Sequence, residues 1–415
     1  MLWPVALLNY LDRMTLASIR SSVRADIPTV ANDADFALLM SLFLWVYAFL
    51  SPVGGYLADR FSRRWAVIVS LFVWSAVTWL TGHARTFEQM AWARALMGIS
   101  EACYIPAALA LIANFHKGPT RSRAVGIHMS GLYMGQALGG LGGYIADSTS
   151  WRNAFYWFGA GGLLYAGVLL LFLRDAPNSH GQEENKHSSI SVGKVLAGVL
   201  GVSSFLILMV YFMLPAMPGW AVKSWLPTHL ATAFGLKQGP AGMSATGYVT
   251  IASFIGVLVG GTLADKWVRR SIRGRIYTSA LGTALCVPAL LVIGFAPTLG
   301  TALGGMLLFG FGFGFFDANN MPILCQLVRR EYRATGYGIM NLVGTSAGAG
   351  VTWVMGSLRD RGISLGIAFT ISAVFAGAGA LLILFARPKE ESNGCDEDLS
   401  PTIAASVYQG SNSPT

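Results

Sequence analysis

The stretches GYLADRFSRR (residues 55–64) and GTLADKWVRR (residues 261–270) are near copies of each other, placed 206 residues apart. Each closes a long apolar segment with an acid and then adds a cluster of cations. A second echo joins RAVGI (residues 123–127) to RATGYGI (residues 333–339). Such echoes indicate that the chain is an internal duplication of two related halves, which is the plan of a repeat-built transporter.

The composition places both halves in a membrane. Of the 415 residues, 54% are hydrophobic and only 12% are charged, and the mean hydropathy is +0.54. Apolar runs of about 20 residues, long enough to cross a bilayer core as helices, recur along the chain. We predict an all-α membrane protein with twelve transmembrane helices in two pseudo-symmetric six-helix bundles. The expected spans are 2–20, 36–58, 65–83, 88–115, 123–146, 152–173, 194–220, 241–265, 275–294, 299–327, 334–357 and 363–386.

Polar stretches separate and follow the two bundles. The segment 174–193 predicts a cytoplasmic linker between an amino-terminal bundle (1–173) and a carboxyl-terminal bundle (194–386). Residues 387–415 are rich in Ser, Asn and acids and predict a disordered cytoplasmic tail. The stretch 221–234 is expected to extend the seventh helix outside the membrane, with a kink near its prolines.

The net charge of +9 follows topology. Lys and Arg concentrate in the loops that lie inside when both termini are cytoplasmic, whereas Lys223 is placed outside. This distribution predicts a multi-pass protein of the plasma or inner membrane, in contact with membrane lipid, and argues against a nucleic-acid partner. We expect a monomer. The first span lacks a small-residue cleavage site and is expected to be a retained helix, and the sequence leaves open whether a cytoplasmic segment precedes it.

Patterns of catalysis or metal binding are not found in the sequence. The four cysteines have no paired spacing, and no Walker A motif is present. We therefore expect neither an enzyme nor a cofactor or metal site. Transport is expected to be driven by an ion gradient rather than by ATP.

Few charges remain inside the predicted spans. They are Asp12 and Arg13 in NYLDR (residues 9–13), Arg94 and Glu101 in RALMGISE (residues 94–101), and Asp317 in the tenth span. An unpaired charge at the bilayer centre costs about 2.5–3.5 kcal/mol or more, so retained charges normally face a cavity and have a partner. Arg94 and Glu101 are seven residues apart and should project from one helix face, about 10 Å from each other along the axis.

This set of charges has the chemistry of coupled transport. Arg13 and Arg94 can hold a carboxylate, because arginine does not deprotonate and binds a carboxylate with two parallel hydrogen bonds. Asp12 and Glu101 can take up protons, and an anion that occupies the arginines frees the acids to do so. We predict proton-coupled symport of a small organic anion by alternating access, around a shared aqueous pocket. The alternative is a static cluster that braces the first and fourth helices.

The repeated GxLAD[RK]xxRR pattern resembles the signature loop of the major facilitator superfamily, and the resemblance covers essentially the whole chain. It implies that the acids and arginines of these loops latch the cytoplasmic helix ends as the halves rock. The implied gating residues are Asp59, Arg60, Arg63, Arg64, Asp265, Arg269 and Arg270. The alternative is that these charges only set topology. Ser62 stands where the family usually has glycine.

NYLDR together with RALMGISEA resembles the organic anion:cation symporters, which import sugar acids such as hexuronate, glucarate and galactonate. The resemblance implies that Asp12 and Glu101 are proton sites and that Arg13 and Arg94 hold the substrate carboxylate. It also implies that Tyr10 and Tyr47 line the cavity. Two other families remain as alternatives. Spinster-type lipid transporters share the four charges, although EACYIP has Ala102 where they have glycine, and drug or metabolite antiporters usually have proline at the position of Gln136.

In the second half, FGFGFFDANNMP (residues 311–322) holds one acid among amides. Asp317 is a candidate proton-coupling residue, and Asn319 and Asn320 can offer donors and acceptors to sugar hydroxyls. The alternative is a helix-packing role. His128 is a further candidate partner for a proton or a hydroxyl group. The competing interpretation is an interhelical hydrogen bond. Gly131, Gly135 and Gly139 recur every four residues and predict close helix packing.

Overall fold

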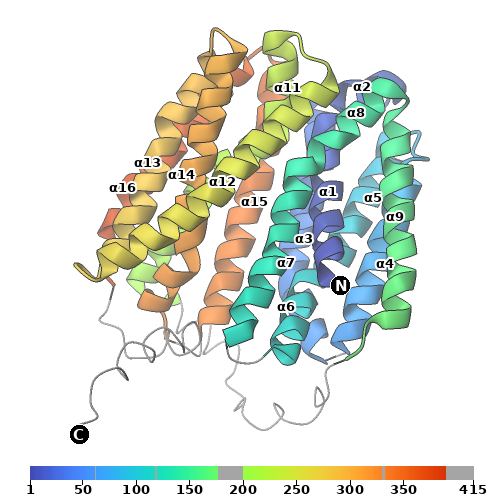
Figure 1. The fold of residues 1–415 in the computed structure, drawn as a ribbon. Helices are drawn as coiled ribbons and strands as arrows, with labels where there is room; N and C mark the ends of the chain where they lie inside the picture. The colour runs from blue at the N-terminus through green and yellow to red at the C-terminus, as the bar shows by residue number, and fades with distance from the viewer. Residues whose placement is uncertain (61, 117–118, 176–199, 330–331, 389–415) are drawn as a thin grey trace, which may run out of the picture.

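The computed structural model describes residues 1–60, 62–116, 119–175, 200–329 and 332–388, and every regular element in these ranges is helical (Figure 1). The amino-terminal group comprises α1 (Leu2–Ser18), α2 (Arg20–Asp26), α3 (Asp33–Arg60), α4 (Arg63–Thr81), α5 (Phe87–Glu101), α6 (Tyr104–Phe115), α7 (Pro119–Ala137), η1 (Leu138–Gly140), α8 (Leu141–Ser148) and α9 (Trp151–Phe172). The carboxyl-terminal group comprises α11 (Ser203–Phe234), α12 (Gln238–Val268), α13 (Gly274–Phe295), α14 (Leu299–Leu327), α15 (Arg333–Asp360), α16 (Leu365–Leu382) and η3 (Ile383–Phe385). Most of the predicted linker and tail lies outside the described residues.

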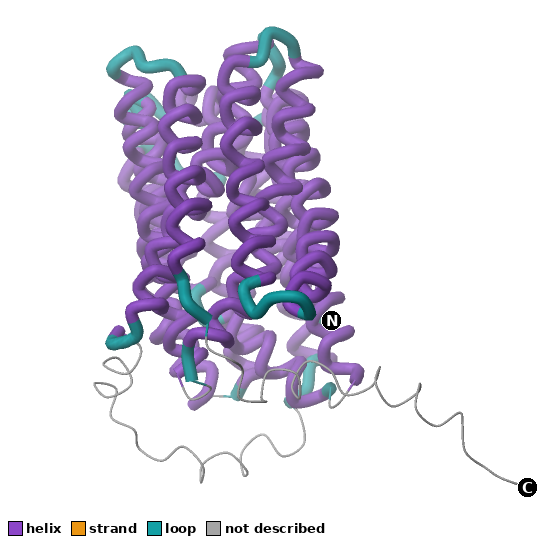
Figure 2. The backbone as a smooth tube through the Cα atoms, turned by 90° about the vertical axis from the view of Figure 1, so that its left-hand side faces the viewer, coloured by secondary structure: helices purple, strands orange, loops and turns teal. Residues whose placement is uncertain are grey.

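The two groups stand side by side, and their long helices run along a common axis with loops at both ends (Figures 1 and 2). Within the described residues, nine helical segments are long and apolar enough to cross a membrane. The predicted number of twelve is not confirmed by this criterion, because α1 has only 17 residues and α7 and α15 are less apolar.

The structure divides two of the predicted spans. The span 88–115 is broken directly after Glu101 into α5 and α6. Pro106 explains the break, because it has no N–H to donate to the carbonyl of Ala102, four residues earlier. The span 123–146 is interrupted by η1 between α7 and α8. In contrast, residues 203–234 form one continuous helix, α11, with Pro215, Pro218 and Pro227 inside it.

Glycines set the contact between α1 and α7. A methyl group at Gly131 would meet the backbone of Trp3, one at Gly135 would meet the carbonyl of Leu7, and one at Gly139 would meet the Met14 side chain. The two backbones therefore approach each other more closely than any larger residue would permit. The packing predicted from the four-residue spacing is confirmed, and it fixes how α1 is oriented.

The two ends of the molecule differ in charge. We call the end that carries Arg63, Arg64, Arg269 and Arg270 the basic end, and the opposite end, where α3 begins and α15 finishes, the Asp33 end (Figure 1).

At the Asp33 end, the two groups are joined by a cluster that we call the Asp33 latch (Arg20, Arg24, Asp33, Arg359 and Asp360). Arg359 Nε of α15 lies 2.7 Å from Asp33 Oδ2 of α3. The carboxylate of Asp360 accepts hydrogen bonds of 2.8 Å from the backbone N–H groups of Asp33 and Ala34, and so caps α3 from the other group. Arg20 and Arg24 also pair with Asp33. These contacts hold the two groups together at this end.

Candidate functional site

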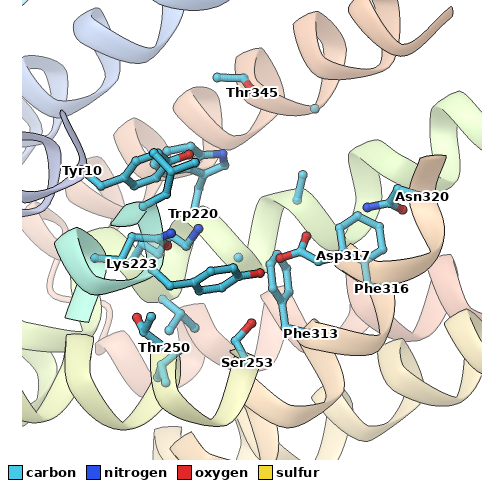
Figure 3. A pocket seen from close by; sticks show the side chains of 18 of the residues that line it. Tyr10, Trp220, Lys223, Thr250, Ser253, Phe313, Phe316, Asp317, Asn320 and Thr345 are labelled. Carbon is cyan, nitrogen blue, oxygen red and sulfur yellow. The ribbon is translucent and has the colours of Figure 1, made fainter. Parts of the chain in front are cut away.

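A cavity of about 390 Å³ lies between the two helix groups (Figure 3). Side chains of α1 and α7 line it from one group, and side chains of α11, α12, α14 and α15 line it from the other. Its polar lining includes Tyr10, Tyr133, Gln136, Lys223, Thr250, Ser253, Asp317, Asn320, Tyr337 and Asn341. The cavity is therefore suited to a solute that carries charge and several hydrogen-bonding groups.

Lys223 is the functional candidate that the sequence prediction missed. We expected it outside the membrane, and this was wrong, because α11 continues without interruption and carries Lys223 into the cavity wall. Its ammonium nitrogen lies 5.3 Å from the ring centre of Trp220 and 5.8 Å from that of Phe313. It makes no ion pair with any residue the structure describes. The signal was present: Lys223 is the only Lys, Arg, Asp or Glu in the segment 203–234.

A second, smaller void of about 20 Å³ adjoins the cavity and shares Met14, Trp220 and Lys223 with it. Arg13, Arg94 and Lys223 all line this void. Three cationic side chains, two from the amino-terminal group and one from the carboxyl-terminal group, thus surround one small space. Such a grouping of cationic side chains favours an anion.

Arg13 is held from several sides. Its Nε donates to Glu101 Oε2 at 2.6 Å, and both side chains are buried. Its guanidinium carbon lies 4.4 Å from the ring centre of Tyr47 and 4.9 Å from that of Tyr10. Its Nη2 is buried and has no hydrogen-bond partner among the described residues. This nitrogen carries two N–H donors, which an anionic oxygen could accept.

Arg94 reaches the same void from α5. Its Nε donates to the carbonyl of Leu39 at 3.3 Å, and its guanidinium carbon lies 4.5 Å from the ring centre of Phe43. Within the described residues it has no carboxylate partner in contact. Arg94 is therefore a buried cation whose charge is not neutralised by an ion pair.

The two predicted proton sites lie behind these arginines. Neither Asp12 nor Glu101 lines the cavity or the small void, and both are buried within the amino-terminal group. Asp12 Oδ2 accepts a hydrogen bond from Thr78 Oγ1 at 3.2 Å. Asp12 Oδ1 and Glu101 Oε1 are buried without a hydrogen-bond partner among the described residues. The four predicted charges do come together, but only the arginines reach an open space.

Of the predicted residues in the second half, some line the cavity and others do not. Asp317 is exposed to the cavity, and Asn320 lines it. Asn319 donates to the carbonyl of Phe315 in its own helix at 2.8 Å and does not line the cavity. His128 is buried, with its ring centre 6.0 Å from that of Tyr104.

The predicted gating residues lie at the basic end. Arg64 donates to the carbonyl of Leu170 at 2.7 Å, and Arg63 donates to the carbonyl of Ala110 at 3.5 Å. Asp265, Arg269 and Arg270 are exposed where α12 ends. The side chains of Asp59 and Arg60 lie outside what the structure describes.

A groove of about 670 Å³ opens between α7 and α12, lined mostly by apolar side chains such as Met134, Ile251 and Phe254. It shares Tyr133 and Thr250 with the central cavity. The central cavity and the groove therefore meet at these two residues.

Comparison with known proteins agrees with this architecture. The family model of the Major Facilitator Superfamily matches residues 2–352. The probable sulfoacetate transporter of Cupriavidus necator is 26% identical over 404 residues, covering 94% of this chain and 93% of that protein. Protein spinster of Drosophila melanogaster is 27% identical over 301 residues, covering 69% of this chain and 48% of that protein. The crystal structure of a bacterial homolog of the human lysosomal transporter Spinster, inward-facing and unoccupied, superimposes with a TM-score of 0.73 at 19% identity, covering 93% of this chain and 94% of that one.

Proposed function

Because the chain belongs to the Major Facilitator Superfamily of membrane transporters, we propose that it is a proton-coupled symporter of a small organic anion. The proposed solutes are sugar acids of the hexuronate, glucarate and galactonate type, moved by alternating access. The similarity to a probable sulfoacetate transporter supports a small organic anion as the class of solute.

One observation carries the proposal: Arg13, Arg94 and Lys223 surround a small void that adjoins a 390 Å³ cavity. Buried cations without counter-ions are costly in a membrane. Arg94 and Lys223 have no ion-pair partner among the described residues, so the site is stabilised when an anion enters beside them. A carboxylate oxygen would enter the void, and the hydroxylated body would occupy the polar cavity beside it.

The contact of Arg13 with Glu101 supplies the coupling. The 2.6 Å ion pair engages one side of the guanidinium. An incoming carboxylate competes for the same guanidinium, and a proton on Glu101 removes the charge that opposes it. Anion and proton therefore favour each other's binding, which is the requirement for symport. Asp12, which is buried nearby, is the proposed second proton acceptor.

Alternating access requires that the two ends open in turn. The Asp33 latch joins the helix groups at one end, so solute exchange in this conformation would proceed through the basic end. The excess of cations in its loops supports a cytoplasmic location for the basic end, and both termini are proposed to lie on the same side. The proposed setting is the cell membrane, with the monomer as the working unit and with Asp59, Asp265 and their neighbouring arginines as the cytoplasmic gate.

A second candidate is movement of a lysolipid or another amphiphile, as in Spinster-like transporters. The apolar groove between α7 and α12 favours it, because the groove meets the central cavity at Tyr133 and Thr250. The similarity to protein spinster supports the same candidate.

Uptake by proteoliposomes under an imposed inward proton gradient distinguishes the two candidates. Labelled glucuronate, galactonate and lysophosphatidylcholine would be offered separately, with a protonophore as the control. We expect gradient-driven uptake of a sugar acid that the protonophore abolishes. Movement of the lipid alone would reject the sugar-acid assignment.

A further inference from the structure

We propose that the solute is a polyhydroxy acid with a single carboxylate, an aldonate or a uronate, and that Asp317 selects it. Asp317 accepts hydrogen bonds from the hydroxyl end of the solute and repels a second carboxylate at that end. This inference rests on the proposed function and narrows its substrate class, because it excludes aldarates, which carry a carboxylate at each end of the carbon chain.

The cavity has two electrostatically different sides. Lys223 lies on one side, near Trp220 and Tyr10 (Figure 3). This side of the cavity adjoins the small void that Arg13 and Arg94 also line. Asp317 lies on the other side, near Phe316 and Asn320 (Figure 3). A solute that spans the cavity therefore meets cations at one end and an acid at the other.

The Asp317 carboxylate is available to a ligand. It is exposed to the cavity, and it forms neither a hydrogen bond nor an ion pair with any residue that the structure describes. Lys223 is close enough to influence it electrostatically but does not form an ion pair with it. The space between these two side chains is where the body of the solute fits.

The groups around Asp317 are suited to hydroxyls. Asn320 is buried, and its Oδ1 has no hydrogen-bond partner among the described residues although the side chain lines the cavity. Ser253 adds a hydroxyl near Asp317 (Figure 3), and Asn341 is a further amide in the lining of the cavity. No cation of the described chain lines this side of the cavity, so a carboxylate placed there would lack a partner.

The length of the solute determines which of its groups meets Asp317. When one carboxylate of a six-carbon acid binds between the cations, its carbon chain extends into the cavity, whose other side carries Asp317. A hydroxymethyl group at that position donates a hydrogen bond to the aspartate. A carboxylate at that position lies against a like charge, and the repulsion opposes its binding.

Galactonate and galactarate form a matched pair for the test, because they differ only in the group at the sixth carbon. Counterflow of labelled galactonate would be measured in proteoliposomes at pH 7.5 on both sides, with either acid as the unlabelled competitor. We expect galactonate to compete about tenfold more strongly than galactarate in the wild type, as like-charge exclusion requires. Asp317→Asn should reduce this ratio to about threefold or less, chiefly by strengthening competition by galactarate.

Two further variants control the comparison. Asp317→Glu keeps the charge and should keep the discrimination. Glu88→Gln removes an exposed acid at the start of α5 and should leave the ratio unchanged. Equal competition by the two acids in the wild type, or an unchanged ratio in Asp317→Asn, overturns this inference and leaves the proposed function standing. Absence of counterflow with labelled galactonate, galactarate and glucuronate alike refutes the proposed function and this inference with it.

Discussion

Arg13 of α1 and Glu101 of α5 are joined by a buried ion pair, with 2.6 Å between Arg13 Nε and Glu101 Oε2. Glu101 is the last residue of α5, directly before the break that Pro106 imposes. The carboxylate therefore lies at a helix end where the backbone is already interrupted. Arg13 can therefore exchange the Glu101 carboxylate for that of the solute, and Glu101 can take up a proton, without disrupting a continuous helix.

The first prediction concerns this pair. Glu101→Gln should retain exchange of labelled solute across the membrane but lose accumulation driven by a proton gradient, because the amide cannot take up a proton. Counterflow and gradient-driven uptake, measured on the same proteoliposomes, separate the two activities. Glu88→Gln is the matched control. Unchanged accumulation in Glu101→Gln would remove Glu101 from the proton pathway.

The second prediction concerns Lys223. Lys223→Gln should raise the KM for the anion about tenfold, the change that corresponds to the loss of one moderately screened charge contact. Lys223→Arg should restore most of the affinity. Lys237→Gln, at an exposed position just before α12, serves as the control and should leave the KM unchanged. A KM that stays constant in Lys223→Gln would show that the anion does not bind near α11.

The third prediction concerns the Asp33 latch. Arg359→Gln removes the 2.7 Å ion pair between the helix groups and leaves the Asp360 cap on α3 in place. Loss of this partly buried pair should favour opening of the Asp33 end by about 1 kcal/mol, roughly a fivefold change in the ratio of open to closed molecules. Spin labels at positions 85 and 361, one on each group, would report a larger population at long distance.

Lys237→Gln is the control for the latch as well, since it removes a cation at the same end and is not part of the latch. Distance distributions that do not differ between Arg359→Gln and the parent protein would contradict a holding role for the ion pair.

The fourth prediction concerns the seam between α1 and α7. Gly135→Ala should destabilise the protein by about 1–3 kcal/mol, because the added methyl group meets the Leu7 carbonyl and the two backbones must move apart. Gly126→Ala on the same helix meets no atom within 4 Å and should be neutral or slightly stabilising. Apparent melting temperatures in one detergent provide the comparison. Equal melting temperatures would show that α1 and α7 can move apart at Gly135 without a loss of stability.

Much of the architecture could be predicted from the sequence because its causes are local. Long apolar runs require a membrane, and the echo of residues 55–64 in residues 261–270 indicates duplication without any knowledge of packing. The helix breaks were harder to predict from the sequence. Pro106 ends one predicted span after Glu101, whereas the three prolines of α11 leave that helix continuous, because neighbouring helices stabilise its backbone.

The sequence alone determined that the chain is helical, membrane-bound and duplicated, and that Asp12, Arg13, Arg94, Glu101 and Asp317 belong to its buried charges. Only the tertiary structure decided which of these face the cavity. Arg13 and Arg94 line the small void, and Asp12 and Glu101 lie behind them. Lys223 lines the same void from the other helix group. The physical reason is that hydropathy places a residue at a depth in the bilayer, whereas the rotation of each helix about its own axis is set by contacts with distant segments, such as the glycine seam between α1 and α7.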